Sequence, residues 1–137
     1  MNNLKLYYAV NLLMESENPL LNQIKDELIP KYGKLIPWFG VGPTNDMREV
    51  FRMDKAAVES ADIIIAEVSY PSHGVGMEVM HAVNLRKPIL AIAQEGKKVS
   101  RMIQGIDFEG FQFSWYKDLE DLDSILNKYF SENKSKI

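Results

Sequence analysis

The chain has 137 residues, of which 46% are hydrophobic and 26% are charged, so one domain with a substantial buried core is expected. The 16 Lys and Arg residues against 19 Asp and Glu give a net charge of −3, which excludes the basic face that long nucleic acids require. The absence of cysteine excludes disulfides, zinc–thiolate sites and thiol catalysis.

Short apolar runs alternate with helical patterns in the first half of the chain. Residues 4–10 are apolar and aromatic and predict the first strand. Apolar residues at helical spacing predict a helix over 20–30. Residues 35–41 predict a second strand, and the turn residues that follow it predict a loop over 40–46.

The second half continues the same alternation. The pattern predicts a helix over 47–61, and the almost wholly apolar run 63–68 predicts a central strand covered on both faces. A loop over 69–76, a helix over 77–85 and a buried strand over 88–93 follow. The remaining predictions are a short helix over 97–104, a strand over 111–116 and a final helix over 119–129.

Five strands that alternate with helices predict a parallel sheet with helices on both faces. We therefore expect an α/β fold, a Rossmann-like or flavodoxin-like three-layer sandwich, in a single domain over 1–130 with a flexible tail over 131–137. The first ten residues lack the apolar core of a signal peptide, and no apolar run approaches the ~20 residues that span a bilayer. A cytoplasmic location without membrane contact is expected.

The loop after the central strand is the first place to look for a site, because ligands bind at the carboxyl ends of parallel strands. Gly74 and Gly76 allow a ligand to approach the backbone closely. The helix predicted to begin there offers free N–H groups and the positive end of its dipole. Ser69 and Ser72 add hydroxyl donors.

Two carboxylates near this loop are candidates for catalysis. Glu78 is predicted in the first turn of a helix, where the dipole would keep it ionised as a nucleophile, although acidic residues also occur there for stability alone. Asp54 stands among apolar neighbours on the preceding helix, and desolvation would raise its pKa and suit it to proton donation. The alternative for Asp54 is an ordinary exposed helix residue. A charged carboxylate beside a protonated one is the arrangement that cleaves glycosidic bonds.

The stretch from Met53 to Ile92 resembles the nucleoside 2-deoxyribosyltransferase superfamily. Asp54 is followed at 71–78 by the run Pro-Ser-His-Gly-Val-Gly-Met-Glu, and the chain is most similar to the 2′-deoxynucleoside 5′-phosphate N-hydrolases. The resemblance implies that Glu78 is the nucleophile and that Asp54 is the acid that assists departure of the base. It also implies that Tyr7 lies near the reacting sugar.

The same resemblance implies how the substrate is bound. Ser72 would bind the 5′-phosphate, and Ser100 would reach the phosphate of a neighbouring subunit, so a homodimer with shared active sites is expected. No metal or cofactor is needed. The implied activity is hydrolysis of the N-glycosidic bond of (deoxy)nucleoside 5′-monophosphates through a glycosyl-Glu78 ester, giving free base and (deoxy)ribose 5-phosphate.

The chain departs from these hydrolases after the first strand, where Val10-Asn-Leu-Leu-Met14 replaces Gly-Ser and a basic, glycine-rich turn. Asn11 can still donate a hydrogen bond, but the phosphate specificity stays open, as does ribonucleotide cleavage of the kind seen in the similar cytidine monophosphate N-glycosidases. Two alternatives remain: base exchange by a nucleoside 2-deoxyribosyltransferase, and a nucleotide-binding sensor without turnover. Ser72 argues against the first, and the pair of Asp54 and Glu78 argues against the second.

Overall fold

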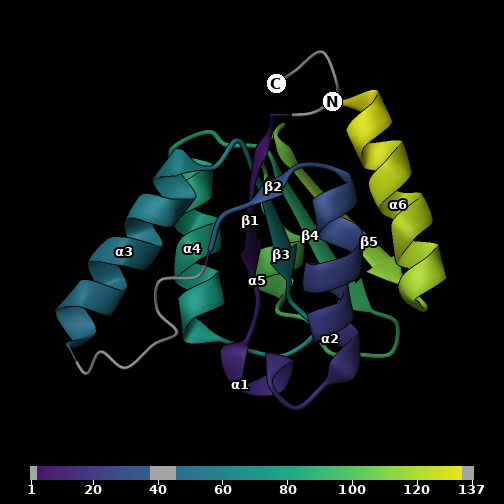
Figure 1. The fold of residues 1–137 in the computed structure, drawn as a ribbon, viewed down its shortest axis with the longest axis horizontal. Helices are drawn as coiled ribbons and strands as arrows, with labels where there is room; N and C mark the ends of the chain where they lie inside the picture. The colour runs from purple at the N-terminus through teal and green to yellow at the C-terminus, as the bar shows by residue number, and fades with distance from the viewer. Residues whose placement is uncertain (1–2, 38–45, 134–137) are drawn as a thin grey trace.

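The structure, a computed structural model, describes residues 3–37 and 46–133. They form a five-stranded sheet whose strands are all parallel, in the order β2-β1-β3-β4-β5. Helices cover both faces of this sheet (Figure 1), so the predicted α/β three-layer sandwich is confirmed, with the strand order of flavodoxin-like folds. The strands are β1 (Lys5–Ala9), β2 (Lys34–Leu35), β3 (Ile63–Glu67), β4 (Ile89–Gln94) and β5 (Phe111–Tyr116).

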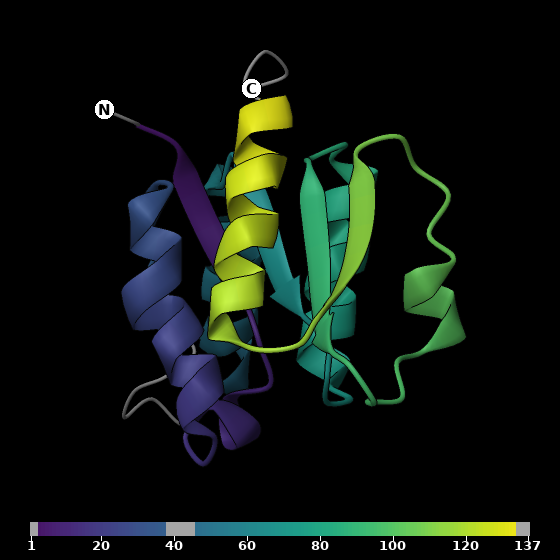
Figure 2. The same cartoon turned by 90° about the vertical axis from the view of Figure 1, so that its right-hand side faces the viewer.

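Helices α3 and α4 lie on one face of the sheet, and α2 and α6 lie on the other (Figures 1 and 2). Each helix in the described part of the chain is too short or too polar to cross a membrane. The helical elements are α1 (Leu12–Glu15), α2 (Pro19–Gln23), the π-helical turn η1 (Ile24–Leu28), the 3-10 turn η2 (Ile29–Lys31), α3 (Met47–Ser60), α4 (His73–Asn84), α5 (Arg101–Gln104) and α6 (Leu119–Glu132).

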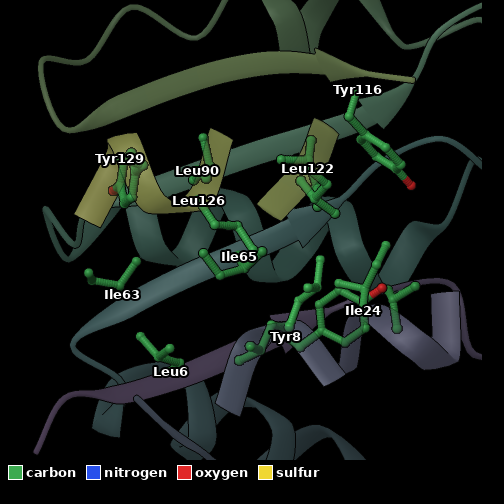
Figure 3. Close-up of a cluster of buried hydrophobic side chains, with 14 of the residues drawn as sticks. Leu6, Tyr8, Ile24, Ile63, Ile65, Leu90, Tyr116, Leu122, Leu126 and Tyr129 are labelled. Carbon is green, nitrogen blue, oxygen red and sulfur yellow. The ribbon is translucent and has the colours of Figure 1, made fainter. Parts of the chain in front are cut away.

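Two apolar layers hold these helices to the sheet. Every residue of β3 is buried, as expected for a central parallel strand. Because successive side chains of a strand point to opposite faces, Ile63 and Ile65 pack under α2 and α6, whereas Ile64 and Ala66 pack under α3 and α4. Figure 3 shows the first layer, in which Leu6, Tyr8, Leu90, Tyr116, Leu122 and Leu126 surround the β3 side chains.

Most element boundaries agree with the sequence patterns. The strands predicted over 63–68, 88–93 and 111–116 are confirmed to within one residue. The helix predicted over 20–30 begins at Pro19 and continues through η1 and η2 to Lys31, and α6 includes the first two residues of the predicted tail. The sequence predicts a second strand over 35–41, but β2 is Lys34–Leu35; residues 1–2, 38–45 and 134–137 lie outside the described residues.

The prediction that the helix after β3 begins at residue 77 is wrong, because α4 begins four residues earlier. The Ser72 hydroxyl accepts a hydrogen bond from the N–H of Val75 at 3.2 Å and so caps the helix there. Gly74 and Gly76 therefore belong to the helix rather than to a loop. Glu78 consequently lies in the second turn of α4, not in the first.

Two other short elements differ from the predictions for local reasons. Helix α1 was not predicted; the Asn11 side chain caps it by accepting hydrogen bonds from the N–H groups of Leu13 and Met14. The helix predicted over 97–104 is limited to α5, which the Ser100 hydroxyl caps by accepting from the N–H of Met102. In both places a side-chain cap sets the residue at which a helix of four residues begins.

Gly33 lies just before β2, where the backbone passes close to β1. Substitution of Gly33 tests this close approach. A Cβ atom there would lie 2.8 Å from the carbonyl oxygen of Leu4 and 2.9 Å from the Leu6 side chain. We expect Gly33→Ala to lower the free energy of unfolding in urea by about 1–3 kcal/mol. Gly76→Ala is the control, because a Cβ atom there meets nothing within 4 Å. Equal stability of Gly33→Ala and the wild type would contradict this packing.

Candidate active site

A cavity of about 360 Å³ opens at the carboxyl ends of β1 and β3. The strand order reverses between these two strands, since β2 lies on one side of β1 and the other three strands lie on the opposite side. Open parallel sheets bind ligands at such a reversal. The walls come from β1 and α1, from Asp54 of α3 and from residues between Pro71 and Glu78.

The Tyr7 hydroxyl donates a hydrogen bond of 2.5 Å to Oε2 of Glu78 at the wall of this cavity. Tyr7 is only 3% exposed, and its side chain points to the face of the sheet that carries α3 and α4. The contact joins residues that are 71 positions apart in the chain. It therefore fixes the Glu78 carboxylate against the central sheet.

Burial raises the pKa of Glu78 to about 7, and the nearby charge of Asp54 adds to this increase while the Tyr7 hydrogen bond opposes it. The prediction that a helix dipole keeps Glu78 ionised is thus wrong, because the side chain stands in the second turn and desolvation dominates. Both protonation states of Glu78 are populated near neutral pH. A carboxylate so poorly solvated is a stronger nucleophile than an exposed one.

Asp54 faces the same cavity from helix α3. It precedes the buried residues Ala57 and Val58 by three and four positions, so it lies on the inward face of the helix. Asp54 is half-buried, in agreement with the partial desolvation inferred from its apolar neighbours. Asp54 and Glu78 also line a second cavity, of about 520 Å³, between α3 and α4. The structure thus brings the two predicted carboxylates together.

Gly74 stands one helical turn before Glu78 and lines both cavities with it. A side chain at this position would project in front of the Glu78 carboxylate, because residues four apart share a helix face. The protein itself has room for one, since a Cβ atom at Gly74 meets only the Ser72 hydroxyl, at 3.9 Å. The open space at Gly74 is thus available to a ligand.

Neutral hydrogen-bond donors gather at the other end of the cavity. The capping bond of Ser72 uses an acceptor lone pair of the hydroxyl and leaves its O–H group out of that bond. The first N–H groups of α4, at His73 and Gly74, have no partner within the helix and lie at the cavity wall. Asn11 uses one N–H of its amide to bind the carbonyl of Pro71 at 2.8 Å. This end of the cavity suits an anion.

Two predicted binding residues lie elsewhere. Gly76 is inside α4, and Ser100 is an exposed residue at the start of α5; neither lines either of these two cavities. In contrast, Leu12 and Leu13 were not predicted to take part and form an apolar lip of the first cavity, with Leu13 79% exposed. The capping residue Asn11, followed by two leucines, was the only signal for this lip in the sequence.

No group of three or more His, Asp or Glu side chains in residues 3–37 and 46–133 is arranged to hold a metal ion. His81, which stands one turn after Glu78, instead pairs with Glu59 through a contact of 2.9 Å between Nε2 and Oε2. Glu59 is also bound by Lys55 at 2.7 Å. His81 is thus committed to a surface cluster beside the second cavity.

The titration of Glu78 is measurable by carboxyl carbon-13 NMR. We expect a pKa of about 7 in the wild type. Tyr7→Phe removes a bond that favours the carboxylate, so this pKa should rise; Asp54→Asn removes a like charge, so it should fall. Tyr8→Phe is the control, because the Tyr8 hydroxyl donates to the carbonyl of Leu21 on the other face. A wild-type pKa near the ordinary value of 4.5 would contradict the burial of Glu78.

Known proteins share this fold and much of this sequence. A Thermofilum pendens protein assigned as 2′-deoxynucleoside 5′-phosphate N-hydrolase 1 is 45% identical over 85 residues, which cover 58% of this chain and 59% of the relative. The 5-hydroxymethyl-dUMP N-hydrolase of Branchiostoma floridae is 34% identical over 87 residues, 61% of this chain and 82% of the relative. The chain spans about half the length of other curated relatives, such as 48% of the mouse 5-hydroxymethyl-dUMP N-hydrolase.

No family model matches the chain. The solved structure of a CMP N-glycosidase from Clostridium botulinum superposes with a TM-score of 0.69 over 91% of this chain and 98% of that one, at 19% identity, and so shares the fold. The resemblance based on Asp54 and the run from Pro71 to Glu78 is confirmed by the sequence relatives. The chain belongs to the family of the 2′-deoxynucleoside 5′-phosphate and 5-hydroxymethyl-dUMP N-hydrolases.

Proposed function

We propose that this protein hydrolyses the N-glycosidic bond of deoxynucleoside 5′-monophosphates, releasing the free base and 2-deoxyribose 5-phosphate. The main support is that Asp54 and Glu78, from two different helices, line the same cavity at the carboxyl ends of β1 and β3. The names of the sequence relatives, which are nucleotide N-hydrolases, agree with this proposal.

The two carboxylates divide the reaction between them. The ionised Glu78 attacks the anomeric carbon as the bond to the base breaks, and the base leaves with the bonding electron pair and takes a proton from Asp54. Water then attacks the same carbon of the glycosyl-Glu78 ester, with Asp54 accepting its proton, and releases the sugar phosphate. Both steps pass through an oxocarbenium-like state, which a carboxylate held close to the carbon stabilises. The Tyr7 hydroxyl orients the attacking oxygen atoms.

The phosphate binds at the neutral end of the cavity. Ser72 and the first residues of α4 line this space, and the positive end of the helix dipole favours an anion there. Neutral donors suffice for a phosphate monoester because hydrogen bonds to an ionised acceptor are about twice as strong as neutral ones.

We further propose that two copies pair through the outer face of α3 and α4. Met47, Phe51, Met77 and Met80 on this face are between 45% and 69% exposed and line the second cavity. A contiguous apolar patch of this kind is typical of an interface. Ser100, the cap at the start of α5 over the same face of the sheet, would then complete the phosphate site of the other subunit.

A nucleotide panel tests the reaction. We expect the wild type to release free base from one or more deoxynucleoside monophosphates, and Glu78→Ala to lose at least about 10³-fold of this activity while staying folded. Because Glu78 must be ionised, kcat/KM should rise with pH, reach half of its plateau near the Glu78 pKa of about 7, and level off about one pH unit above it. Chromatography of the released base measures both effects.

Glu132→Ala, an exposed glutamate of α6, is the matched control and should keep full activity. Ribonucleotides belong in the same panel, because they separate deoxyribose from ribose specificity. A new nucleotide formed when a second base is added would instead favour base exchange. Tight binding of nucleotides that stay intact in the presence of the wild type would favour a sensor and defeat the proposal.

Mixed dimers test the sharing of active sites. When Glu78→Ala and Ser100→Ala chains are expressed together, half of the dimers contain both, and each of these has one site with Glu78 and Ser100 intact. We expect about a quarter of the wild-type activity, well above that of either variant alone. Activity no greater than the average of the two single variants would show that each chain builds its site alone.

A further inference from the structure

Glu67 is a fully buried carboxylate that the proposed reaction does not use. It ends strand β3 and is 1% exposed. Successive side chains of a strand point to opposite faces, and Ile64 and Ala66 point to the face that carries Tyr7 and α4. The Glu67 side chain therefore points to the other face. It therefore lies on the opposite side of the sheet from the cavity carboxylates.

Three donors surround this carboxylate. The Tyr116 hydroxyl donates to Oε2 of Glu67 at 2.5 Å, and the Ser69 hydroxyl donates to the same oxygen at 2.7 Å. The N–H of Ser69 donates to Oε1 at 2.8 Å. The Ser69 hydroxyl in turn accepts from the N–H of Gln94 at 2.8 Å. Glu67 thus connects the ends of three neighbouring strands, β3, β4 and β5, and Figure 3 shows Tyr116 on the inner face of β5.

Ser69 belongs to the β3–α4 segment (residues 68–72), which carries one wall of the cavity. Glu67 binds both the side chain and the N–H group of Ser69, so it fixes the start of the segment from the face of the sheet that carries α2 and α6. Farther along, Asn11 holds the carbonyl of Pro71 at 2.8 Å. The segment ends at Ser72, the cap of α4. A shift at Ser69 would therefore move the donors of Ser72 and of the first turn of α4.

The burial of a charge at this place needs a reason beyond packing. Taking a carboxylate out of water is costly unless every oxygen is hydrogen-bonded, and an apolar side chain of similar volume would avoid that cost. Burial raises the pKa of Glu67, whereas the hydrogen bonds from Tyr116 and Ser69 lower it. Unlike an apolar residue, the carboxylate fixes the orientation of Ser69. One of its oxygens binds the Ser69 hydroxyl and the other binds the Ser69 N–H.

We propose that Glu67 is a positioning residue for phosphate recognition, which fixes the β3–α4 segment so that Ser72 and the first N–H groups of α4 face the phosphate of the ligand. This inference rests on the proposed function for the identity of that ligand. Glu67 itself touches neither the phosphate nor the reacting sugar. Its effect should therefore appear in the affinity for a phosphate ester and not in the cleavage of a substrate without phosphate.

Two variants disturb this network with little change in volume. Glu67→Gln replaces one of the two carboxylate oxygens by an amide N–H₂ group. One of the positions that now accept hydrogen bonds from Ser69 and Tyr116 therefore becomes a donor. Tyr116→Phe removes one hydroxyl only, and so tests the same network if the first variant fails to fold. Tyr129→Phe is the matched control, because Tyr129 is buried in the same apolar layer and has no hydrogen bond to Glu67.

Calorimetry with 2-deoxyribose 5-phosphate measures the affinity for the ester, and base release measures kcat and KM for a deoxynucleotide and for its nucleoside without phosphate. We expect Glu67→Gln to raise the Kd of the ester and the KM of the nucleotide about tenfold, and to leave kcat/KM of the nucleoside unchanged. Tyr116→Phe should act in the same direction to a smaller extent, and Tyr129→Phe should change neither value.

Equal losses for nucleotide and nucleoside would indicate a general structural role and overturn the inference, as would unchanged affinity for the ester in both variants. The calorimetric measurement does not depend on turnover. If the wild type releases no base but binds the ester, the proposed function fails and the role of Glu67 is still tested. If the wild type binds no ester, the positioning role is rejected.

Discussion

The hydrogen bond between Tyr7 and Glu78 is the contact on which the rest of the site depends. It ties α4 to the central sheet and holds a carboxylate in a place where water solvates it poorly. In the folded protein the pKa of Glu78 lies above its ordinary value, so the folded state binds more protons than the unfolded chain between pH 4.5 and about 7. The free energy of unfolding therefore falls as pH rises through this window, so burial of the Glu78 carboxylate lowers the stability of the folded protein.

The strand order places this contact where a ligand can reach it. Successive residues of β1 point to opposite faces, so Tyr7 reaches Glu78 under α3 and α4, while Tyr8 packs with Tyr116 in the layer under α2 and α6. A similar division separates Glu78 from Glu67. One acidic side chain faces the cavity, and the other is enclosed by donors behind the segment that forms its wall. The carboxylate at the cavity and the carboxylate that holds the β3–α4 segment thus lie on opposite faces of one sheet.

Sequence patterns predicted the fold and placed Asp54 and Glu78 near the loop after the central strand, but they did not predict the environment of these two carboxylates. The apolar run of β3 and the alternation of strands and helices are local signals, and Asp54 and Glu78 could be found from their place beside the central strand. The start of α4 could not, because Gly74 and Gly76 are poor helix formers and only the Ser72 cap explains where the helix begins. That error placed Glu78 at a helix end and led to the wrong expectation that the helix dipole keeps it ionised.

Contacts between distant parts of the chain were also beyond the sequence. Tyr7 and Glu78 are 71 residues apart, and Tyr116 and Glu67 are 49 apart, so no local pattern joins them. In the sequence, Glu67 is a polar residue at the end of an apolar strand. Its burial depends on β5, which lies more than 40 residues farther along the chain. Ser100 lines neither cavity of its own chain, and its predicted role requires a second copy.

We propose above all that Glu78 attacks the sugar while Asp54 assists the departing base. Rapid acid quench of the wild type during turnover of a deoxynucleoside monophosphate, followed by peptide mass spectrometry, tests it most directly. We expect a deoxyribose 5-phosphate adduct on the peptide that contains Glu78, and we expect this adduct to accumulate when a 2-fluoro substituent on the sugar slows the second step. Base release with no adduct, or with an adduct on another residue, would contradict it.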